Sequence, residues 1–256
     1  MCTLTAVPLP GVRLRLAFNR DERPTRPPAL PPAVRAFGDR LAVLPIDPVS
    51  GGTWLGVNDA GLALAVLNVT LPTPSPPALL PQGERGAKTS RGTIIPALLG
   101  QATPADALAE LDRTFDYADF APFRLAVVGR GVVAEVRWDG REPMVTTRLL
   151  GGAPLLFTSS GLGDHLVEGV RRELFDDLFA GPSDGWAAAQ DEFHRHRWPG
   201  REHLSVNMAR ATARTVSYAV VDLAGESSTV TYHPAAPHES GKPTIVRLPI
   251  APTGAS

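Results

Sequence analysis

The chain has 256 residues, of which 43% are hydrophobic and 20% are charged, and its formal net charge is −1. This composition is typical of a globular protein with enough apolar residues for a buried core, and it excludes disorder of the whole chain. No run of Lys or Arg offers a surface for a phosphate backbone, and no apolar run approaches the ~20 residues that cross a bilayer, so nucleic-acid partners and a membrane span are excluded.

The single cysteine and the lack of a linker indicate the cellular compartment and the number of domains. Cys2 has no partner for an internal disulfide, which fits a reducing compartment. Prolines and arginines interrupt the early apolar residues, so these form no signal-peptide core. We therefore expect a cytoplasmic protein, and the richness in Ala, Pro and Arg suggests a GC-rich bacterial genome. We expect one domain over residues 1–256, with an extended tail from about residue 242.

Cys2, next to the initiator methionine, is the first chemically informative residue. Removal of Met1 would place a thiol and a free α-amine on one residue. The amine has a reference pKa of about 7.7–8.0 and can act as a general base near neutral pH. The thiol has a reference pKa of about 8.5 and needs only a modest shift toward thiolate to attack a carbonyl. The chain start therefore predicts a nucleophile that activates itself.

Residues 13–23, RLRLAFNRDER, alternate between apolar and polar as a half-buried strand does. The period of two puts Asn19 and Asp21 on one face and Arg20 and Glu22 on the other. If this strand lies beside the first, the Asp21 carboxylate can accept a hydrogen bond from the ammonium of Cys2 and orient it.

Prolines and glycines shape the following segment. Residues 23–32 hold five prolines and predict a surface loop. Residues 40–46 predict a short strand. Gly51 and Gly52 then form a turn, which either is only tight or lets the chain approach a neighbouring backbone or a ligand closely.

The runs TWLGVN and GLALAVLNV, at residues 53–58 and 61–69, predict a hairpin whose second strand is covered on both faces. Asn68 lies near the end of the second run. It either lines a pocket near the nucleophile or caps a turn.

A proline-rich segment and a helix come next. Residues 71–87 have no periodicity, and we expect them to cover the mouth of a pocket. Residues 88–101 predict a helix capped by Thr89 or Ser90. Its first-turn amides can hold an anion or a developing oxyanion. Arg91 either pairs with a substrate carboxylate or is a surface residue.

The rest of the chain predicts strands and amphipathic helices. Helices are expected at residues 104–115 and 164–179 and within 186–203, strands at 144–150 and 154–160, and hairpins at 123–140 and 213–234. The expected apolar stripe of the helix at residues 164–179 consists of Leu166, Val167, Val170, Leu174 and Leu178.

Three histidines lie close together at His194, His196 and His203. A spacing of two residues puts the first pair on different sides of a helix, so they do not form a zinc site of the usual helical kind. We expect them to be solvated surface side chains.

The chain resembles the NRDE family, whose eukaryotic member is called transport and Golgi organisation protein two. The resemblance rests on Cys2, on NRDE at residues 19–22 and on GGTWLGVN at residues 51–58, and it extends to residues 214–218. It implies an N-terminal nucleophile hydrolase fold, similar to choloylglycine hydrolases and penicillin V acylases, with two antiparallel sheets between helical layers in an αββα sandwich. The strand pattern alone supports only the α+β class.

The resemblance also implies roles for individual residues. Cys2 attacks an amide, Asp21 and Asn19 orient its amine, and Asn68, Ser159 and the helix-start amides receive the negative oxygen. Arg214 is similar to an arginine near the nucleophile of related hydrolases, with structural salt bridging as its alternative role. The expected substrate-contacting residues are Trp54, Ser90 and Arg91.

The sequence departs from the related hydrolases at two places. Phe18 stands where choloylglycine hydrolases have an arginine. Arg20 belongs to the predicted catalytic segment, but it is out of register with that arginine, and we expect its side chain to face elsewhere. Ser159 stands near the place of an asparagine that helps to hold the oxyanion. A hydroxyl has a shorter reach, and loss of one oxyanion donor lowers the rate by about 10²–10³-fold.

The sequence therefore predicts a hydrolase of a non-peptide carbon–nitrogen amide bond in a small molecule, with no metal or cofactor. The alternative is a small-molecule carrier without turnover, since NRDE relatives have been linked to haem trafficking. A haem carrier needs an axial ligand, for which His165 and His233 are the candidates. The sequence indicates neither which amide is hydrolysed nor the oligomeric state.

Overall fold

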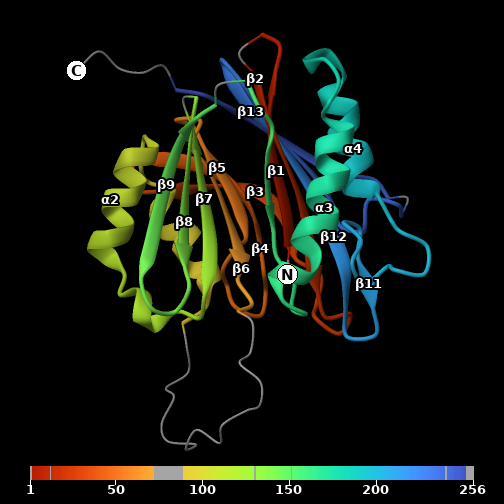
Figure 1. Cartoon of the computed structure of the whole chain (residues 1–256). Helices are drawn as coiled ribbons and strands as arrows, with labels where there is room; N and C mark the ends of the chain where they lie inside the picture. Colours follow the sequence, from red (N-terminus) through yellow and green to blue (C-terminus); the bar gives the residue numbers. More distant parts are fainter. Residues whose placement is uncertain are drawn as a thin grey trace, which may run out of the picture.

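The structure is a computed structural model that describes residues 2–11, 13–71, 89–129, 131–150, 152–239 and 241–251. The described residues form two antiparallel sheets of seven strands each, stacked face to face between helices (Figure 1). Helices α3 and α4 cover one sheet, and α1 and α2 cover the other. The α+β class and the αββα layering expected from the sequence are confirmed. Among these residues, no helix is long and apolar enough to cross a membrane.

Both sheets combine strands that are distant in the sequence. Sheet A has the order β10 (Leu155–Thr158), β1 (Cys2–Leu9), β2 (Arg13–Glu22), β12 (Ala213–Ala224), β13 (Ser227–His233) and β14 (Thr244–Pro249), and β11 (Ala209–Arg210) pairs with β12. Sheet B has the order β3 (Leu30–Phe37), β4 (Arg40–Ile46), β5 (Leu55–Asn58), β6 (Ala63–Asn68), β7 (Phe123–Gly129), β8 (Val132–Trp138) and β9 (Pro143–Leu149). The α-helices are α1 (Ile94–Leu98), α2 (Pro104–Thr114), α3 (Asp164–Leu178) and α4 (Trp186–Arg195), and short 3₁₀ turns are η1 (Arg91–Thr93), η2 (Tyr117–Asp119) and η3 (Ser183–Gly185).

Strand β3 corrects one expectation. The sequence predicts a loop over residues 23–32, but the strand already begins at Leu30. Proline removes a ladder hydrogen bond, so it is tolerated only at sheet edges and irregular positions. Strand β3 is an edge of sheet B, and its pairing with β4 shifts register between Leu30 and Ala33, the stretch that holds Pro31 and Pro32. The edge position therefore lets a proline-rich segment join the sheet.

The main core lies between the two sheets. Leu4, Phe18 and Leu64 are fully buried there and belong to the same cluster as Cys2. Because side chains alternate along a strand, Cys2 projects to the same face of β1 as Leu4. The thiol therefore lies at the end of the inner layer, where the core gives way to a cavity.

Helix α3 buries most of the predicted apolar stripe fully or in part, but Leu166 lies outside the buried face and Arg171 lies within it. Leu166 of the expected apolar stripe is 49% exposed, whereas Val167, Arg171 and Phe175 are buried. Arg171 is only 1% exposed. Its guanidinium donates to the hydroxyls of Thr3 and Thr158 and to the carbonyls of Leu204 and Ser205. The helix is thus anchored to sheet A by a buried arginine whose hydrogen bonds offset part of its desolvation.

His194 also contradicts its expectation, because it is fully buried instead of solvated. Helix α4 packs on the outer face of β1 and β2 and turns this residue toward them. Its Nε2 lies 2.7 Å from Thr5 Oγ1, and its Nδ1 lies 3.0 Å from Asn19 Oδ1. Burial lowers the pKa of His194 from 6.5 to about 3. His196 is half-buried, and His203 is exposed, as expected.

This burial predicts a pH dependence of stability. The unfolded chain binds a proton at His194 below about pH 6.5, whereas the folded chain does not until about pH 3, so the free energy of unfolding falls as the pH falls through this window. We expect a loss of about 2 kcal/mol from this residue between about pH 8 and pH 5. Urea unfolding across this range should show the slope, and the variant His194→Gln should lack the part that His194 contributes.

Candidate active site around Cys2

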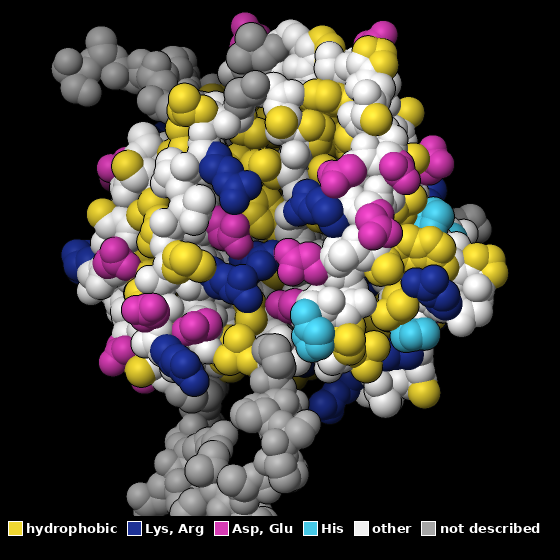
Figure 2. Space-filling view, viewed as in Figure 1, with side chains coloured by type: hydrophobic (Ala, Val, Ile, Leu, Met, Phe, Trp, Pro, Cys, Tyr) yellow, Lys and Arg dark blue, Asp and Glu magenta, His cyan; other side chains and the backbone are white. Residues whose placement is uncertain are grey.

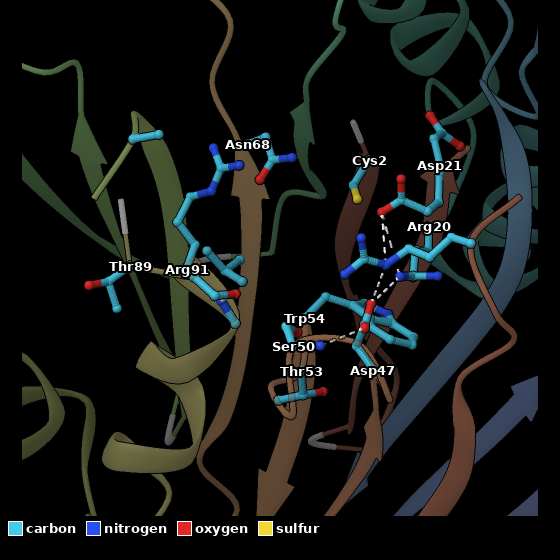
Figure 3. A pocket seen from close by; sticks show the side chains of 16 residues that line it. Cys2, Arg20, Asp21, Asp47, Ser50, Thr53, Trp54, Asn68, Thr89 and Arg91 are labelled. Atoms are coloured by element: carbon cyan, nitrogen blue, oxygen red, sulfur yellow. Dashed lines mark hydrogen bonds and ion pairs between the residues drawn. The ribbon is translucent and has the colours of Figure 1, made fainter. Parts of the chain in front are cut away.

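A cavity of about 300 Å³ lies at the end of β1 and β2 where Cys2 and Asp21 are located (Figure 3). Its walls come from both sheets, from the turn after β4 and from η1. The lining residues are Cys2, Arg20, Asp21, Glu22, Arg26, Asp47, Ser50, Thr53, Trp54, Val66, Asn68, Thr89, Ser90, Arg91, Gly92 and Ala121. The cavity collects most of the residues predicted for the site, and Asn19, Ser159 and Arg214 lie outside its lining.

The pairing of three strands positions Cys2. Strand β1 lies between β2 and β10, with Cys2 opposite Arg20, so both side chains project to the inner face. Burial raises the pKa of the Cys2 thiol above its ordinary value, and the negative charge of Asp21 also raises it, whereas the positive charge of Arg20 lowers it. Activation of the thiol therefore requires a nearby base.

Ser159, predicted as an oxyanion donor, instead contacts the backbone of Cys2. The Cys2 nitrogen donates to Ser159 Oγ at 2.9 Å, and the Ser159 nitrogen donates to the Cys2 carbonyl at 2.9 Å. The Ser159 hydroxyl also donates to that carbonyl at 3.3 Å. The serine therefore holds the nitrogen atom that would become the α-amine.

Asp21 is a buried carboxylate with one unused oxygen. It is 4% exposed, and its Oδ1 accepts a hydrogen bond of 2.7 Å from Thr215 Oγ1. Its Oδ2 has no hydrogen-bond partner among the described residues. Burial raises the pKa of Asp21 from 3.8 to about 6, although the positive charge of Arg171 opposes the shift. The site thus holds an unsatisfied acceptor, which is costly unless a donor reaches it.

Arg20 lies inside the cavity, so the expectation that it faces elsewhere is wrong. Its guanidinium carbon lies 4.4 Å from the ring centroid of Trp54, and its Nη2 lies 2.6 Å from Asp47 Oδ2. Glu22 Oε2 lies 3.6 Å from the same nitrogen. The register with Cys2, which places both side chains on one face, decides this orientation.

The indole nitrogen of Trp54 has no hydrogen-bond partner among the described residues.

The turn at Gly51 and Gly52 brings two backbones together. A Cβ at Gly52 would lie 2.5 Å from the carbonyl carbon of Gly92, and the Thr53 nitrogen donates to the Gly92 carbonyl at 3.0 Å. Of the alternatives left by the sequence, the structure shows the close approach to a neighbouring backbone. This contact joins the turn after β4 to η1 and so joins two walls of the cavity.

The segment predicted as one helix over residues 88–101 is η1 followed by the short helix α1. Ser90 caps it, as predicted, by accepting a 3.3 Å hydrogen bond from the Gly92 nitrogen. The Thr93 nitrogen donates to the Ser90 carbonyl. Because these two first-turn amides already have acceptors, they are not available to hold an oxyanion in this conformation.

Arg91 and Asn68 form the wall that faces Cys2, with the guanidinium beside the amide (Figure 3). Arg91 Nη1 donates to the Pro122 carbonyl at 2.9 Å. Burial lowers the pKa of Arg91, and no carboxylate pairs with it among the described residues. A largely buried cation without a counter-charge is a strong attractor for an anionic group.

Two predicted residues have other contacts. The Asn19 amide donates to the carbonyls of His194 and Val206, on the outer face of sheet A. Arg214 is exposed, and its Nη1 lies 3.5 Å from Glu239 Oε1, which corresponds to the salt-bridging alternative. Asn19 therefore supports the strand that carries Asp21 and does not contact the Cys2 nitrogen.

The sequence missed several residues that shape the site. Asp47 binds both Arg20 and Arg26 from the turn after β4, and its position directly after an apolar strand is the signal that points to it. Thr215 orients Asp21 from a β-bulge in β12. Arg171 gave no signal, because an arginine in an amphipathic helix is usually solvated.

Other predicted features lie elsewhere. The loop expected to cover the pocket mouth, residues 71–87, falls outside the described residues except for Leu71. His165 is exposed and His233 is half-buried, and neither lines the cavity. The structure therefore brings neither proposed axial ligand to Cys2.

The fold is similar to that of solved hydrolases. An N-acylethanolamine-hydrolyzing acid amidase orthologue from Caenorhabditis elegans aligns with a TM-score of 0.57 at 12% identity, over 86% of this chain and 92% of that one. Two variants of a conjugated bile acid hydrolase from Clostridium perfringens align with TM-scores of 0.53 and 0.52 at 11% identity, over 96% of this chain and 92% of theirs. The chain therefore shares the fold of these proteins.

Sequence comparisons identify the family. A comparison with curated proteins found no match. The family model described as Transport and Golgi organisation 2 matches residues 1–145, which is more than half of the chain. Since this match includes Cys2 and the whole of β2 with its NRDE residues, the chain belongs to the Transport and Golgi organisation 2 family.

Proposed function

We propose that the protein hydrolyses a non-peptide amide bond in a small molecule, with Cys2 as the nucleophile after removal of Met1. The observation that carries this proposal is the buried, unpartnered Oδ2 of Asp21 next to Cys2. A terminal α-amine at Cys2 has protons to donate: Ser159 Oγ already accepts from this nitrogen, and the unpartnered Asp21 Oδ2 lines the same cavity as Cys2. The same nitrogen in an internal peptide bond has only one proton, and it donates that proton in the hydrogen bond to Ser159 Oγ.

The proposed reaction has two halves. In the first, the α-amine of Cys2 takes the thiol proton and the sulfur attacks the amide carbon. The carbon–nitrogen bond then breaks, and the leaving amine departs with that proton, which leaves a thioester on Cys2. In the second, the α-amine takes a proton from water, whose oxygen attacks the thioester, and the acid leaves as the thiol is restored.

The opposite wall supplies the remaining roles. Asn68 donates from its amide to the oxygen that becomes negative in each half. Arg91 binds an anionic group elsewhere in the substrate, because its guanidinium is buried without a carboxylate. The proposed substrate is therefore a linear amide that carries a carboxylate or a similar anion.

The function is tested on a panel of linear amides with the amine product measured by mass spectrometry. The panel should include N-acylethanolamines and conjugated bile acids, because two of the structural neighbours are described by hydrolysis of these compounds, and N-acyl amino acids, because they carry a carboxylate. Intact mass shows whether Met1 is absent and whether an electrophilic amide analogue adds to Cys2. A discrete absorption shift with haemin, without release of any amine, would favour the carrier function instead.

Arg91→Gln is expected to raise KM for a carboxylate-bearing amide by about tenfold or more, because a charge-assisted hydrogen bond to the substrate is lost. For a matched neutral amide, KM should change little. Arg35→Gln is the control, since Arg35 is an exposed arginine on β3 that does not line the cavity. An equal fall in kcat/KM on the carboxylate-bearing and the neutral amide would assign Arg91 to the reacting oxygen and not to a substrate anion.

A further inference from the structure

A second cavity, of about 280 Å³, lies between β7–β9 and α3 and shares no lining residue with the Cys2 cavity. Its charged lining residues are Arg124, Glu135, Arg137, Arg148, Glu168 and Arg172. Figure 2 looks onto this face and shows basic and acidic side chains gathered around a hollow between the strands and the helix. Four arginines against two glutamates give the cavity an excess of positive charge.

The stacking of the two sheets explains why the cavity exists. Strand β14 contacts β3 and β4, and β1 contacts β6, so the two sheets run across each other in matching order. Sheet A ends at β10, whereas sheet B continues through β8 to β9. The face of these last strands that would otherwise join the core has no strand opposite it. Polar side chains therefore occupy positions that are apolar elsewhere in the inner layer.

The strand register places like charges side by side. Arg124 of β7 is directly opposite Arg137 of β8, and their side chains share one face. Such a pair of like charges is destabilising unless an anion lies nearby. Glu135 supplies one, because its Oε1 lies 2.9 Å from Arg124 Nε. Glu135 therefore pairs directly with Arg124, whereas no carboxylate of the described residues lies within ion-pair distance of Arg137.

Among the described residues, the other three arginines have no carboxylate within ion-pair distance, although burial raises the pKa of the Asp164 carboxyl and the positive charge of Arg137 acts to lower it. Within the described part of the chain, Arg137 and Arg148 make no ion pair and no hydrogen bond, and Arg172 donates to the Leu156 carbonyl at 3.2 Å. Arg124 has a side chain only 8% exposed, and its Nε makes no hydrogen bond of acceptable geometry. Of the four arginines only Arg124 is buried, and a buried guanidinium group without full hydrogen bonding is costly and marks a place where an acceptor is missing. Arg137 and Arg172 are half-buried and Arg148 is exposed, so all three can reach a ligand in the cavity.

We infer that this second cavity binds a small dianion, held by the guanidinium groups of Arg137, Arg148 and Arg172. Guanidinium groups pair with phosphate and carboxylate oxygens through two parallel hydrogen bonds, so three of them from two strands and a helix can surround one such ligand. The volume lies near the lower end of the range for ligand pockets, which favours a small molecule over a peptide segment. An anion here also offsets the repulsion between Arg124 and Arg137.

The test is calorimetric titration of the full chain at low ionic strength, with pyrophosphate and with citrate as separate probes. At least one probe is expected to bind with one-to-one stoichiometry and with an affinity that falls as salt is added. Arg137→Gln and Arg148→Gln should each weaken binding by about tenfold or more. Binding of pyrophosphate alone assigns a phosphate ligand, and binding of citrate alone assigns a carboxylate ligand.

Two variants serve as controls. Arg35→Gln removes an exposed arginine from β3 at the opposite edge of sheet B and should bind the probe with parental affinity. Arg91→Gln removes the proposed anion contact of the Cys2 cavity and should leave the binding that depends on Arg137 and Arg148 in place, since the two cavities share no lining residue. Absence of binding at about 10 mM of either probe overturns the inference, and so does an equal weakening by every arginine variant. Weakening by Arg91→Gln alone would place the anion beside Cys2 and would also overturn it. Should Arg137→Gln fail to fold, the exposed Arg148 provides the same test.

Discussion

Replacing Cys2 with alanine is expected to lower the rate of amide hydrolysis by about 10⁴-fold or more. The sequence contains no other thiol, and loss of the nucleophile removes the covalent pathway, so only binding and electrostatic stabilisation remain. The measurement is release of the amine from the best substrate of the panel, with Cys2→Ala and the parent at equal concentration. No thioester mass should be found in the variant.

Stability provides the control for this loss. Cys2 is 7% exposed, and the change to alanine removes a single sulfur atom, so the free energy of unfolding should change by about 1 kcal/mol. Cys2→Ser keeps the shape and a weaker nucleophile and is expected to lie between the parent and the alanine variant. If Cys2→Ala kept more than about one hundredth of the parental rate, Cys2 would not be the nucleophile.

The part of the site that could be predicted from sequence is the part that depends on strand periodicity. The period of two in residues 13–23 assigns Asn19 and Asp21 to one face and Arg20 and Glu22 to the other, and the structure shows that division. Cys2 begins strand β1, and the pairing of β1 with β2 then brings the thiol and Asp21 into one cavity. These relations need only the backbone geometry of paired strands.

The missed part depends on contacts between distant elements. Arg20 was expected to face elsewhere because its position was compared with that of related hydrolases, whereas its direction is set by pairing with Cys2. Arg171 and His194 are buried because α3 and α4 pack on sheet A, and in the sequence both look like surface residues of amphipathic helices. A helical pattern indicates which face is apolar on average, but not which polar side chain a neighbouring sheet will satisfy.

Asp21→Asn is expected to lower the hydrolysis rate by about 10³-fold. The amide can still accept from Thr215, but it removes the negative charge that would hold the ammonium of Cys2 and favour its protonated form after it takes the thiol proton. KM should change less than kcat, because Asp21 is proposed to act through Cys2 and not on the substrate. Thr215→Val, which removes only the hydroxyl beside Asp21, should show a smaller loss in the same direction.

The same substitution is expected to stabilise the folded chain above about pH 6 when Met1 is retained. The folded chain keeps a proton on Asp21 up to about pH 6, whereas the unfolded chain loses it near pH 3.8, so the unfolding free energy of the parent falls as the pH rises between these values. Above this window the ionised carboxylate costs up to about 3 kcal/mol, which asparagine does not. The stability difference between variant and parent should therefore be near zero at about pH 4 and reach its full size above about pH 6.

Removal of Met1 should reduce this difference, because the new ammonium of Cys2 would donate to Asp21 Oδ2 and favour the ionised carboxylate. Urea unfolding of preparations with and without Met1, sorted by intact mass, measures the effect directly. If Asp21→Asn raises the unfolding free energy of the chain that keeps Met1 but lowers the hydrolysis rate, the carboxylate does not serve the stability of the fold. That combination would assign Asp21 to the chemistry of Cys2. An Asp21→Asn variant that is less stable at every pH, with or without Met1, would instead make Asp21 a structural partner of Thr215 and remove it from the mechanism.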